Sequence, residues 1–197
     1  MPFIAKSGKE IEVKCLYKDN FTVMGMAGEG PMQNPSSWIK PLWELAAANK
    51  FAEIDALLLK NPEGKPLFWG AMAAATQLKE GFAYLAGGEV AANAKAPIGW
   101  EKWQIPAQSY VVAAATMDDL AEVCWQLPAV LKDEIVGPLH EFYPNPDNPN
   151  IIDVYIPIAK GKLKCKACEM EMLKPEDFGT EANGLPSRTY CRYCRKD

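Results

Sequence analysis

Four cysteines near the C-terminus constrain the fold more than any other feature of this sequence. They form two Cys-x-x-Cys pairs, Cys165/Cys168 and Cys191/Cys194, separated by 22 residues. Each pair can present two thiolates from one tight turn, and four thiolates satisfy the tetrahedral coordination of Zn²⁺ in structural sites. So short a segment cannot build a sufficient apolar core alone, and metal binding would supply part of its folding free energy. We therefore expect a structural zinc site at these cysteines and a separate module over residues 161–197.

The same segment resembles small treble-clef or ribbon-like zinc fingers, in which a Lys174–Phe178-like step and a polar turn separate the two cysteine pairs. Residues 160–197 carry nine lysines and arginines against six acidic residues. Part of that charge would balance the thiolates, so we favour a protein partner or a homodimer over nucleic acid as the contact of this tail. A redox role for either pair is a weaker alternative, since it would not need the second pair.

The remainder of the chain is mildly acidic, since residues 1–159 carry 19 acidic residues against 12 lysines and arginines, and the whole chain has the composition of a folded protein. The 197 residues are 49% hydrophobic and carry a net charge of −4, which excludes general disorder and a chain built to coat nucleic acid. No segment approaches the roughly 20 apolar residues of a membrane span, and the first residues lack the apolar run of a signal peptide. We expect a cytoplasmic protein without membrane contact, where cysteines favour metal binding over disulfides.

The order of predicted elements is repeated within residues 1–160. Each half reads strand, helix, strand, strand from hydrophobic periodicity and turn residues. The segments are 12–27, a helix from Ser36 or Ser37, 66–75 and 82–90, and then 110–114, a helix from Asp118 or Asp119 that Pro128 ends or kinks, 139–143 and 151–158. Two βαββ units bury their apolar surfaces most simply in one antiparallel sheet with helices on one face. We expect an α+β fold of duplicated βαββ units, with a ligand groove on the other face.

Three segments resemble the GyrI-like (gyrase-inhibitor-like) family of effector-binding domains. Pro106–Val112 is similar to the family's IPA-x-x-Y strand, His140–Pro144 to its E-x-Y strand, and Asp153–Ile158 to its closing strand. The order and spacing match through roughly residues 10–160. The resemblance implies a duplicated βαββ fold whose groove binds small, often aromatic or cationic molecules. Some members belong to transcription regulators with a DNA-binding domain. Because residues 1–10 leave no room for one, we expect a stand-alone member with a small-molecule-binding domain over residues 1–160.

Strand alternation places Glu141 and Tyr143 on one face and His140 and Phe142 on the other. A carboxylate among aromatic rings suits an organic cation, because the rings offer π faces and the acid supplies a counter-charge in a medium of low dielectric. Most buried tryptophans are core residues, and Trp43 is expected to be one of them. We expect the ligand site to combine Glu141 with Tyr143, Tyr110, Trp38, Trp69, Trp103 and Tyr155.

These features favour a small-molecule-binding protein for hydrophobic or aromatic, including cationic, compounds. One alternative is a hydrolase of electrophilic small molecules, a chemistry attributed to some members of the family, with Glu141 as a general base whose pKa partial burial raises. A second is a regulatory interaction protein whose zinc finger contacts nucleic acid or a partner protein. We favour binding over catalysis: dinucleotide, P-loop and zincin motifs are missing from the sequence, and its one histidine, His140, should point away from Glu141.

Overall fold

The computed structural model describes residues 3–48, 51–131 and 134–194. The chain divides into two compact units, each built from segments that are distant in sequence. Unit 1 comprises Met1–Asp19, Pro106–Gly137 and Asn150–Asp197, and unit 2 comprises Asn20–Ile105 and Pro138–Pro149. None of the described helices is both long enough and apolar enough to cross a membrane.

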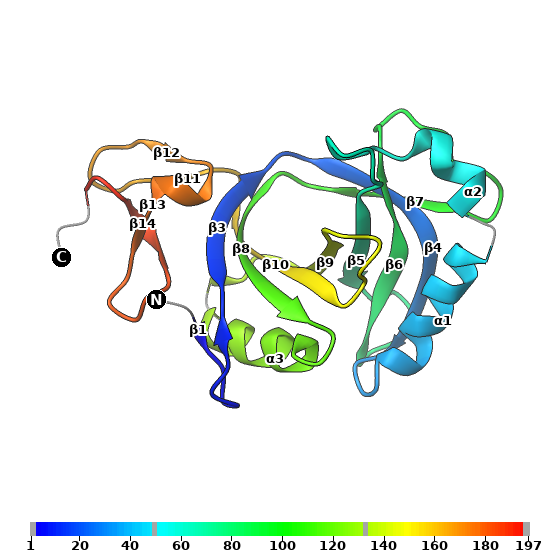
Figure 1. Ribbon diagram of the computed structural model, residues 1–197, viewed down its shortest axis with the longest axis horizontal. Helices are drawn as coiled ribbons and strands as arrows, with labels where there is room; N and C mark the ends of the chain where they lie inside the picture. Colours follow the sequence, from blue (N-terminus) through cyan, green and yellow to red (C-terminus); the bar gives the residue numbers. More distant parts are fainter. Residues whose placement is uncertain (1–2, 49–50, 132–133, 195–197) are drawn as a thin grey trace. The chain divides into compact units, whose positions relative to one another are not determined.

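Unit 2 is built on five antiparallel strands in the order β9-β5-β6-β4-β7. Their bounds are Phe21–Pro31 for β4, Phe68–Ala74 for β5, Gly81–Val90 for β6, Glu101–Ile105 for β7 and His140–Tyr143 for β9. Helix α1 (Ser36–Ala47) packs along β4 and β6 (Figure 1). A Cβ at Gly28 would meet Leu42, and one at Gly30 would meet Trp38. These two glycines therefore let α1 lie close against the sheet.

The segment that follows α1 covers the same face of the sheet. Helix α2 (Phe51–Ile54) and the 3-10 helix η1 (Asp55–Leu57) follow α1. Their apolar side chains join a buried cluster that draws on strands and helices alike: Met24, Met26, Ala46, Ile54, Leu58, Val90 and Trp100. This cluster anchors the helical segment beside α1 by removing apolar surface from water.

Unit 1 contains three antiparallel strands in the order β3-β8-β10. Their bounds are Val13–Lys18, Gln108–Thr116 and Ile151–Lys160. Helix α3 (Leu120–Leu131) packs on β8 and β10 (Figure 1) and buries Val123, Leu127 and Leu131. Alternate residues of β10 are buried as one apolar row, made of Ile152, Val154, Ile156 and Ile158.

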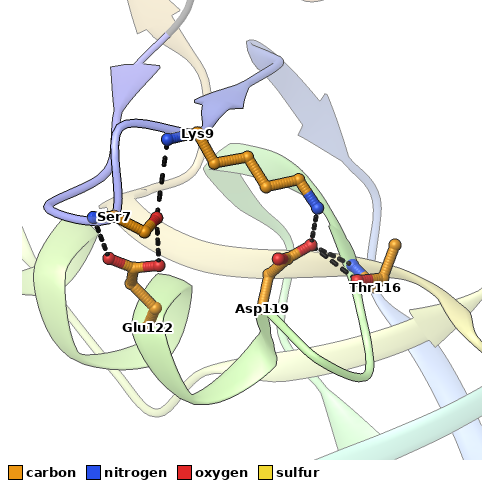
Figure 2. A network of polar contacts seen from close by, with 5 residues as sticks. All are labelled: Ser7, Lys9, Thr116, Asp119 and Glu122. Atoms are coloured by element: carbon orange, nitrogen blue, oxygen red, sulfur yellow. Dashed lines mark hydrogen bonds and ion pairs between the residues drawn. The ribbon is translucent and has the colours of Figure 1, made fainter.

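An N-terminal hairpin is attached to the start of α3 (Figure 2). Its strands are β1 (Phe3–Ile4) and β2 (Glu10–Ile11). The Glu122 carboxylate accepts hydrogen bonds from the Ser7 N–H at 2.9 Å and the Ser7 hydroxyl at 2.7 Å. The Lys9 ammonium pairs with Asp119, which also accepts hydrogen bonds from the Thr116 N–H and hydroxyl. The turn of the hairpin is therefore held by side chains rather than by an apolar core.

The C-terminal segment consists of short elements that group with unit 1. They are β11 (Leu163–Lys164), β12 (Glu171–Met172), the 3-10 helix η3 (Pro175–Asp177), β13 (Phe178–Thr180) and β14 (Pro186–Cys191). The Tyr17 N–H of β3 donates to the Leu173 carbonyl at 2.8 Å. The Arg188 guanidinium of β14 makes a two-point contact with the carboxylate of Glu134. The segment is thus tied to the edge strand of unit 1 and to the region that follows α3.

The predicted α+β class and the repeated element order are confirmed: β4-α1-β5-β6 is followed by β8-α3-β9-β10. The first helix begins at Ser36, as expected, and ends at Ala47. Pro128 does not end α3, which continues to Leu131, because burial of Leu127 and Leu131 on either side offsets the lost helical hydrogen bond. The domain boundary expected at residue 160 stays a prediction.

Candidate functional site

Glu141 lies buried within the sheet of unit 2, with 6% of its surface exposed. It sits opposite Gly70 of β5 in the strand register. Its Oε2 atom accepts hydrogen bonds from the hydroxyls of Tyr84 at 2.5 Å and Tyr143 at 3.0 Å. A Cβ at position 70 would lie 1.9 Å from the Tyr84 hydroxyl oxygen and 2.8 Å from the Glu141 carboxylate. A glycine at position 70 is therefore what allows Tyr84 to reach Glu141.

The buried surroundings of Glu141 shift the pKa of its carboxyl group. Burial raises the pKa of Glu141, and the hydrogen bonds from Tyr84 and Tyr143 act in the opposite direction. Burial first, and then the charge of Glu141, raise the pKa of Tyr84 well above its usual range. Within the described parts of the chain, no lysine or arginine pairs with Glu141. A bound cation would supply the counter-charge that the site lacks.

Two tryptophans of α1 cover the carboxylate and its tyrosines. Trp43 Nε1 donates to the Tyr84 hydroxyl at 3.1 Å, and the indole meets the Tyr143 ring edge-on at 4.9 Å between centroids. Trp38 packs against Phe82 at 5.0 Å and meets Tyr84 edge-on at 6.3 Å. The site is therefore an aromatic enclosure around one acid, closed on one side by α1.

Trp43 and Tyr84 were missed as site residues by the sequence analysis. Trp43 was assigned to the core because most tryptophans are. Tyr84 had a detectable signal, since it alternates with Phe82 along β6 and so shares its face. The side on which the site lies also differs from expectation: Glu141 is on the face that α1 covers, not on a face free of helices. Alternation identifies residues that share a face but not the face that a helix will occupy.

Trp69 is not part of this enclosure. It lies opposite Phe142 in the register, and its ring packs against Phe142 at 4.7 Å, so it occupies the sheet face away from Glu141. Its Nε1 donates to Glu89 at 3.0 Å. His140 lies on this second face as well. Burial lowers the pKa of His140 to about 4, and its Nδ1 accepts the Met72 N–H at 3.2 Å.

Three further predicted residues lie elsewhere. Trp103 is in β7 and donates its indole N–H to Glu101 at 3.1 Å. Tyr110 and Tyr155 belong to unit 1, where their rings meet edge-on at 5.4 Å. Within unit 2 the structure therefore brings Glu141 together with Tyr143 and, through Tyr84, with Trp38.

The four C-terminal cysteines converge on one point. All four sulfur atoms lie within 4.8 Å of one another, and the Cys168 and Cys191 sulfurs are 3.7 Å apart. A tetrahedral site with 2.3 Å metal–sulfur bonds has an edge of about 3.8 Å between sulfurs. A tight turn within each pair holds this geometry: the Glu169 N–H donates to the Cys165 carbonyl, and the Cys194 N–H donates to the Cys191 carbonyl. The donor set fits a metal ion with no coordination position left for substrate.

Comparison with protein families assigns both parts of the chain. The model of the GyrI-like small molecule binding domain matches residues 11–159. The chain belongs to the GyrI-like family. A zinc ribbon domain matches residues 164–197, which contain the four cysteines. The family resemblance and the C-terminal zinc-binding module predicted from the sequence are thereby confirmed.

Solved structures share the fold of this GyrI-like chain at low identity. SAV2435 bound to tetraphenylphosphonium is 14% identical with a TM-score of 0.59, over 75% of this chain and 93% of that one. A transcription regulation protein from Staphylococcus aureus MU50 is 16% identical with a TM-score of 0.54, over 77% and 99%. EcmrR in a DNA complex is 15% identical with a TM-score of 0.53, over 76% and 58%. No curated protein matches the sequence.

Proposed function

We propose that this GyrI-like protein binds hydrophobic organic cations in unit 2, with Glu141 as the counter-charge. The observation that carries this proposal is a buried carboxylate held by two tyrosine hydroxyls, to which no described lysine or arginine is paired. Attraction between unlike charges strengthens when water is excluded, and aromatic faces attract cations. The tetraphenylphosphonium complex of SAV2435, which shares the fold, supports this class of ligand.

Entry of a ligand requires Trp43 to move away from Tyr143. Helix α1 is suited to such a displacement, because it has no side-chain cap, contains Pro41 and fully buries only Ala46. Each of these features lowers the free energy that holds the helix in place. A cation that enters beside Glu141 should therefore change the fluorescence of Trp43.

This function is tested by titrating the protein with tetraphenylphosphonium and measuring binding by calorimetry and by tryptophan fluorescence. Glu141→Gln keeps the shape but removes the charge, and we expect it to weaken binding at least tenfold, or about 1.4 kcal/mol. Glu89→Gln is the matched control, since Glu89 is a second buried carboxylate of the same unit. Equal affinity of wild type and Glu141→Gln, or no saturation below millimolar ligand, would exclude the proposal.

The raised pKa of Glu141 also favours one catalytic function, hydrolysis of an electrophile such as a strained epoxide. Glu141 would take a proton from water as the water oxygen bonds to carbon and the ring C–O bond breaks. The epoxide oxygen would take the hydroxyl proton of Tyr143, and Glu141, which accepts a hydrogen bond from that hydroxyl, would return its proton to the tyrosine. Turnover of such a compound, lost in Glu141→Gln, would establish the activity. Stoichiometric binding without turnover would leave binding as the function.

We further propose that Cys165, Cys168, Cys191 and Cys194 hold a structural Zn²⁺ in a module of residues 161–197, separate from the binding domain of residues 1–160. The sulfur spacing and the zinc ribbon match support the choice of metal. Reduced thiols as ligands fit the cytoplasm. A closed four-thiolate site stabilises a fold and does not catalyse a reaction.

A further inference from the structure

A cavity of about 510 Å³ lies in unit 1, apart from the Glu141 enclosure. One wall is formed by the N-terminal part of β3, including Val13 and Cys15, together with Glu10 and Glu12. The opposite wall comes from the C-terminal module, with Phe178 and Thr180 of β13 and Pro186 of β14. The cavity therefore lies between the edge strand of one sheet and a hairpin of the zinc-binding segment.

The backbone of β3 offers hydrogen-bonding groups to this cavity. The Ala114 N–H of β8 bonds to the Glu12 carbonyl at 3.0 Å. Because pairing alternates in an antiparallel ladder, Lys14 also faces β8, and the N–H and C=O groups of Val13, Cys15 and Tyr17 point outward. The Tyr17 N–H already bonds to the Leu173 carbonyl outside the sheet. The outward groups of Val13 and Cys15 belong to residues that line the cavity.

The cavity carries a negative charge at the end formed by β2 and β3. The Glu10 and Glu12 side chains are exposed, and no ion pair of theirs occurs in residues 3–48, 51–131 and 134–194. The Lys14 ammonium lies 3.5 Å from the Asp153 carboxylate, so its charge is already balanced. Two unbalanced carboxylates beside an open strand edge favour a positively charged occupant.

We propose that this cavity binds an extended, basic segment of a partner protein by strand addition to β3. Backbone hydrogen bonds to Val13 and Cys15 would provide affinity, as they do when a peptide extends a sheet edge. Alternate arginine or lysine side chains would meet Glu10 and Glu12, and the apolar side chains between them would pack on Phe178. This interaction surface is independent of the cation site in unit 2.

A fluorescein-labelled hexapeptide of alternating arginine and valine is the probe, and the full chain is titrated against it by fluorescence anisotropy. The matching peptide with glutamate in place of arginine tests the sign of the charge. We expect saturable binding of the basic peptide only, weakened at least tenfold by the double change Glu10→Lys and Glu12→Lys. Glu80→Lys, an exposed change in unit 2, should leave the affinity unchanged. Equal binding of the two peptides would overturn the proposal.

The backbone contribution has a separate test. Two versions of the basic peptide carry N-methyl groups on alternate amides, one version for each edge of the extended strand. Strand addition predicts that one version loses binding and the other keeps it, whereas equal effects from both would contradict it. Val13→Pro removes an outward N–H and spares the ladder to β8, so it should weaken binding as well. Dimerisation of the protein alone, reversed by Val13→Pro, would instead assign the edge to a second copy of this chain.

Discussion

Glu141 and His140 are neighbours in β9, and each is an ionisable side chain buried on its own face of the sheet. Glu141 is 6% exposed and His140 is 3% exposed. Burial favours the neutral form of each, so it raises the pKa of the acid and lowers that of the base. Glu141 has tyrosine hydroxyls that stabilise its charge, and His140 accepts a backbone N–H that suits a neutral ring. One short strand thus presents a chargeable group to Tyr84 and Tyr143 on one face of the sheet and a neutral group on the other face.

The lowered pKa of His140 predicts a pH dependence of stability. Between its ordinary value of 6.5 and about 4, the unfolded chain binds a proton that the folded chain does not. The free energy of unfolding should therefore fall as the pH falls through this range, by roughly 1.4 kcal/mol per pH unit. Urea unfolding at pH 7.5 and pH 5 should show wild type losing about 2 kcal/mol more than His140→Gln.

The raised pKa of Glu141 changes the free energy of unfolding with pH in the opposite direction, so its contribution has to be separated from that of His140. Its raised pKa contributes stability that is fully present below its ordinary value of 4.5 and is lost as the pH rises through the folded-state pKa. Both proteins contain Glu141, so its contribution cancels in the comparison. Identical pH profiles for wild type and His140→Gln would contradict the burial argument for His140.

The N-terminal hairpin is held by the buried side chains of Ala5 and Ile11 and by polar contacts of its turn. Its turn is fixed to α3 by Ser7, Lys9, Asp119 and Glu122 (Figure 2), so polar contacts determine its position. The contacts between Ser7 and Glu122 are exposed and contribute little to global stability, but they control local opening of the turn.

Loss of the Glu122 carboxylate should therefore loosen the hairpin without unfolding the domain. Glu122→Ala removes the acceptor of the Ser7 N–H, and we expect faster hydrogen exchange at that amide with the melting temperature nearly unchanged. Asp118→Ala, an exposed acid beside the same helix start, is the control. Protection of the Ser7 amide as in wild type would show that the hairpin is held by other contacts.

Local patterns were sufficient to predict the elements but not their partners. The alternation of β10 and the turn residues around each strand are short-range signals, and the strands and helices appeared in the predicted order. The pairing of β9 with β5 places Glu141 opposite Gly70, a residue distant in sequence, and local periodicity does not predict this pairing. The cover of Glu141 by Trp43 is equally non-local, which explains why Trp43 and Tyr84 were not expected beside the carboxylate. The convergence of the four cysteines was predictable because each pair forms a short-range motif with fixed chemistry.

On the scale of the whole molecule, the cysteine cluster and the Glu141 enclosure belong to different compact units. The zinc-binding segment contacts unit 1 through Tyr17 and Arg188. Metal binding should therefore stabilise that segment and the cavity beside β3, while the cation binding proposed at Glu141 should depend on residues of unit 2 alone.

Removal of zinc should therefore destabilise the C-terminal segment without weakening the binding of tetraphenylphosphonium. We expect one zinc per chain by elemental analysis, and less than about half an equivalent would count against the site. Cys168→Ser should lower the zinc content and make residues 161–194 sensitive to protease, with tetraphenylphosphonium affinity within twofold of wild type. Cys124→Ser, outside the cluster, should retain the metal. Loss of cation binding together with zinc would show that the units are not independent.

The assignment of β9 to unit 2 has a consequence for the origin of the molecule. This strand belongs to the second βαββ copy in sequence, yet it completes the sheet of the first copy and supplies Glu141 to it. A single copy expressed alone would possess Tyr84 and both tryptophans of α1 but no acid between them. If the chain arose by gene duplication, an ancestor with one copy would have needed a second molecule to lend it a strand.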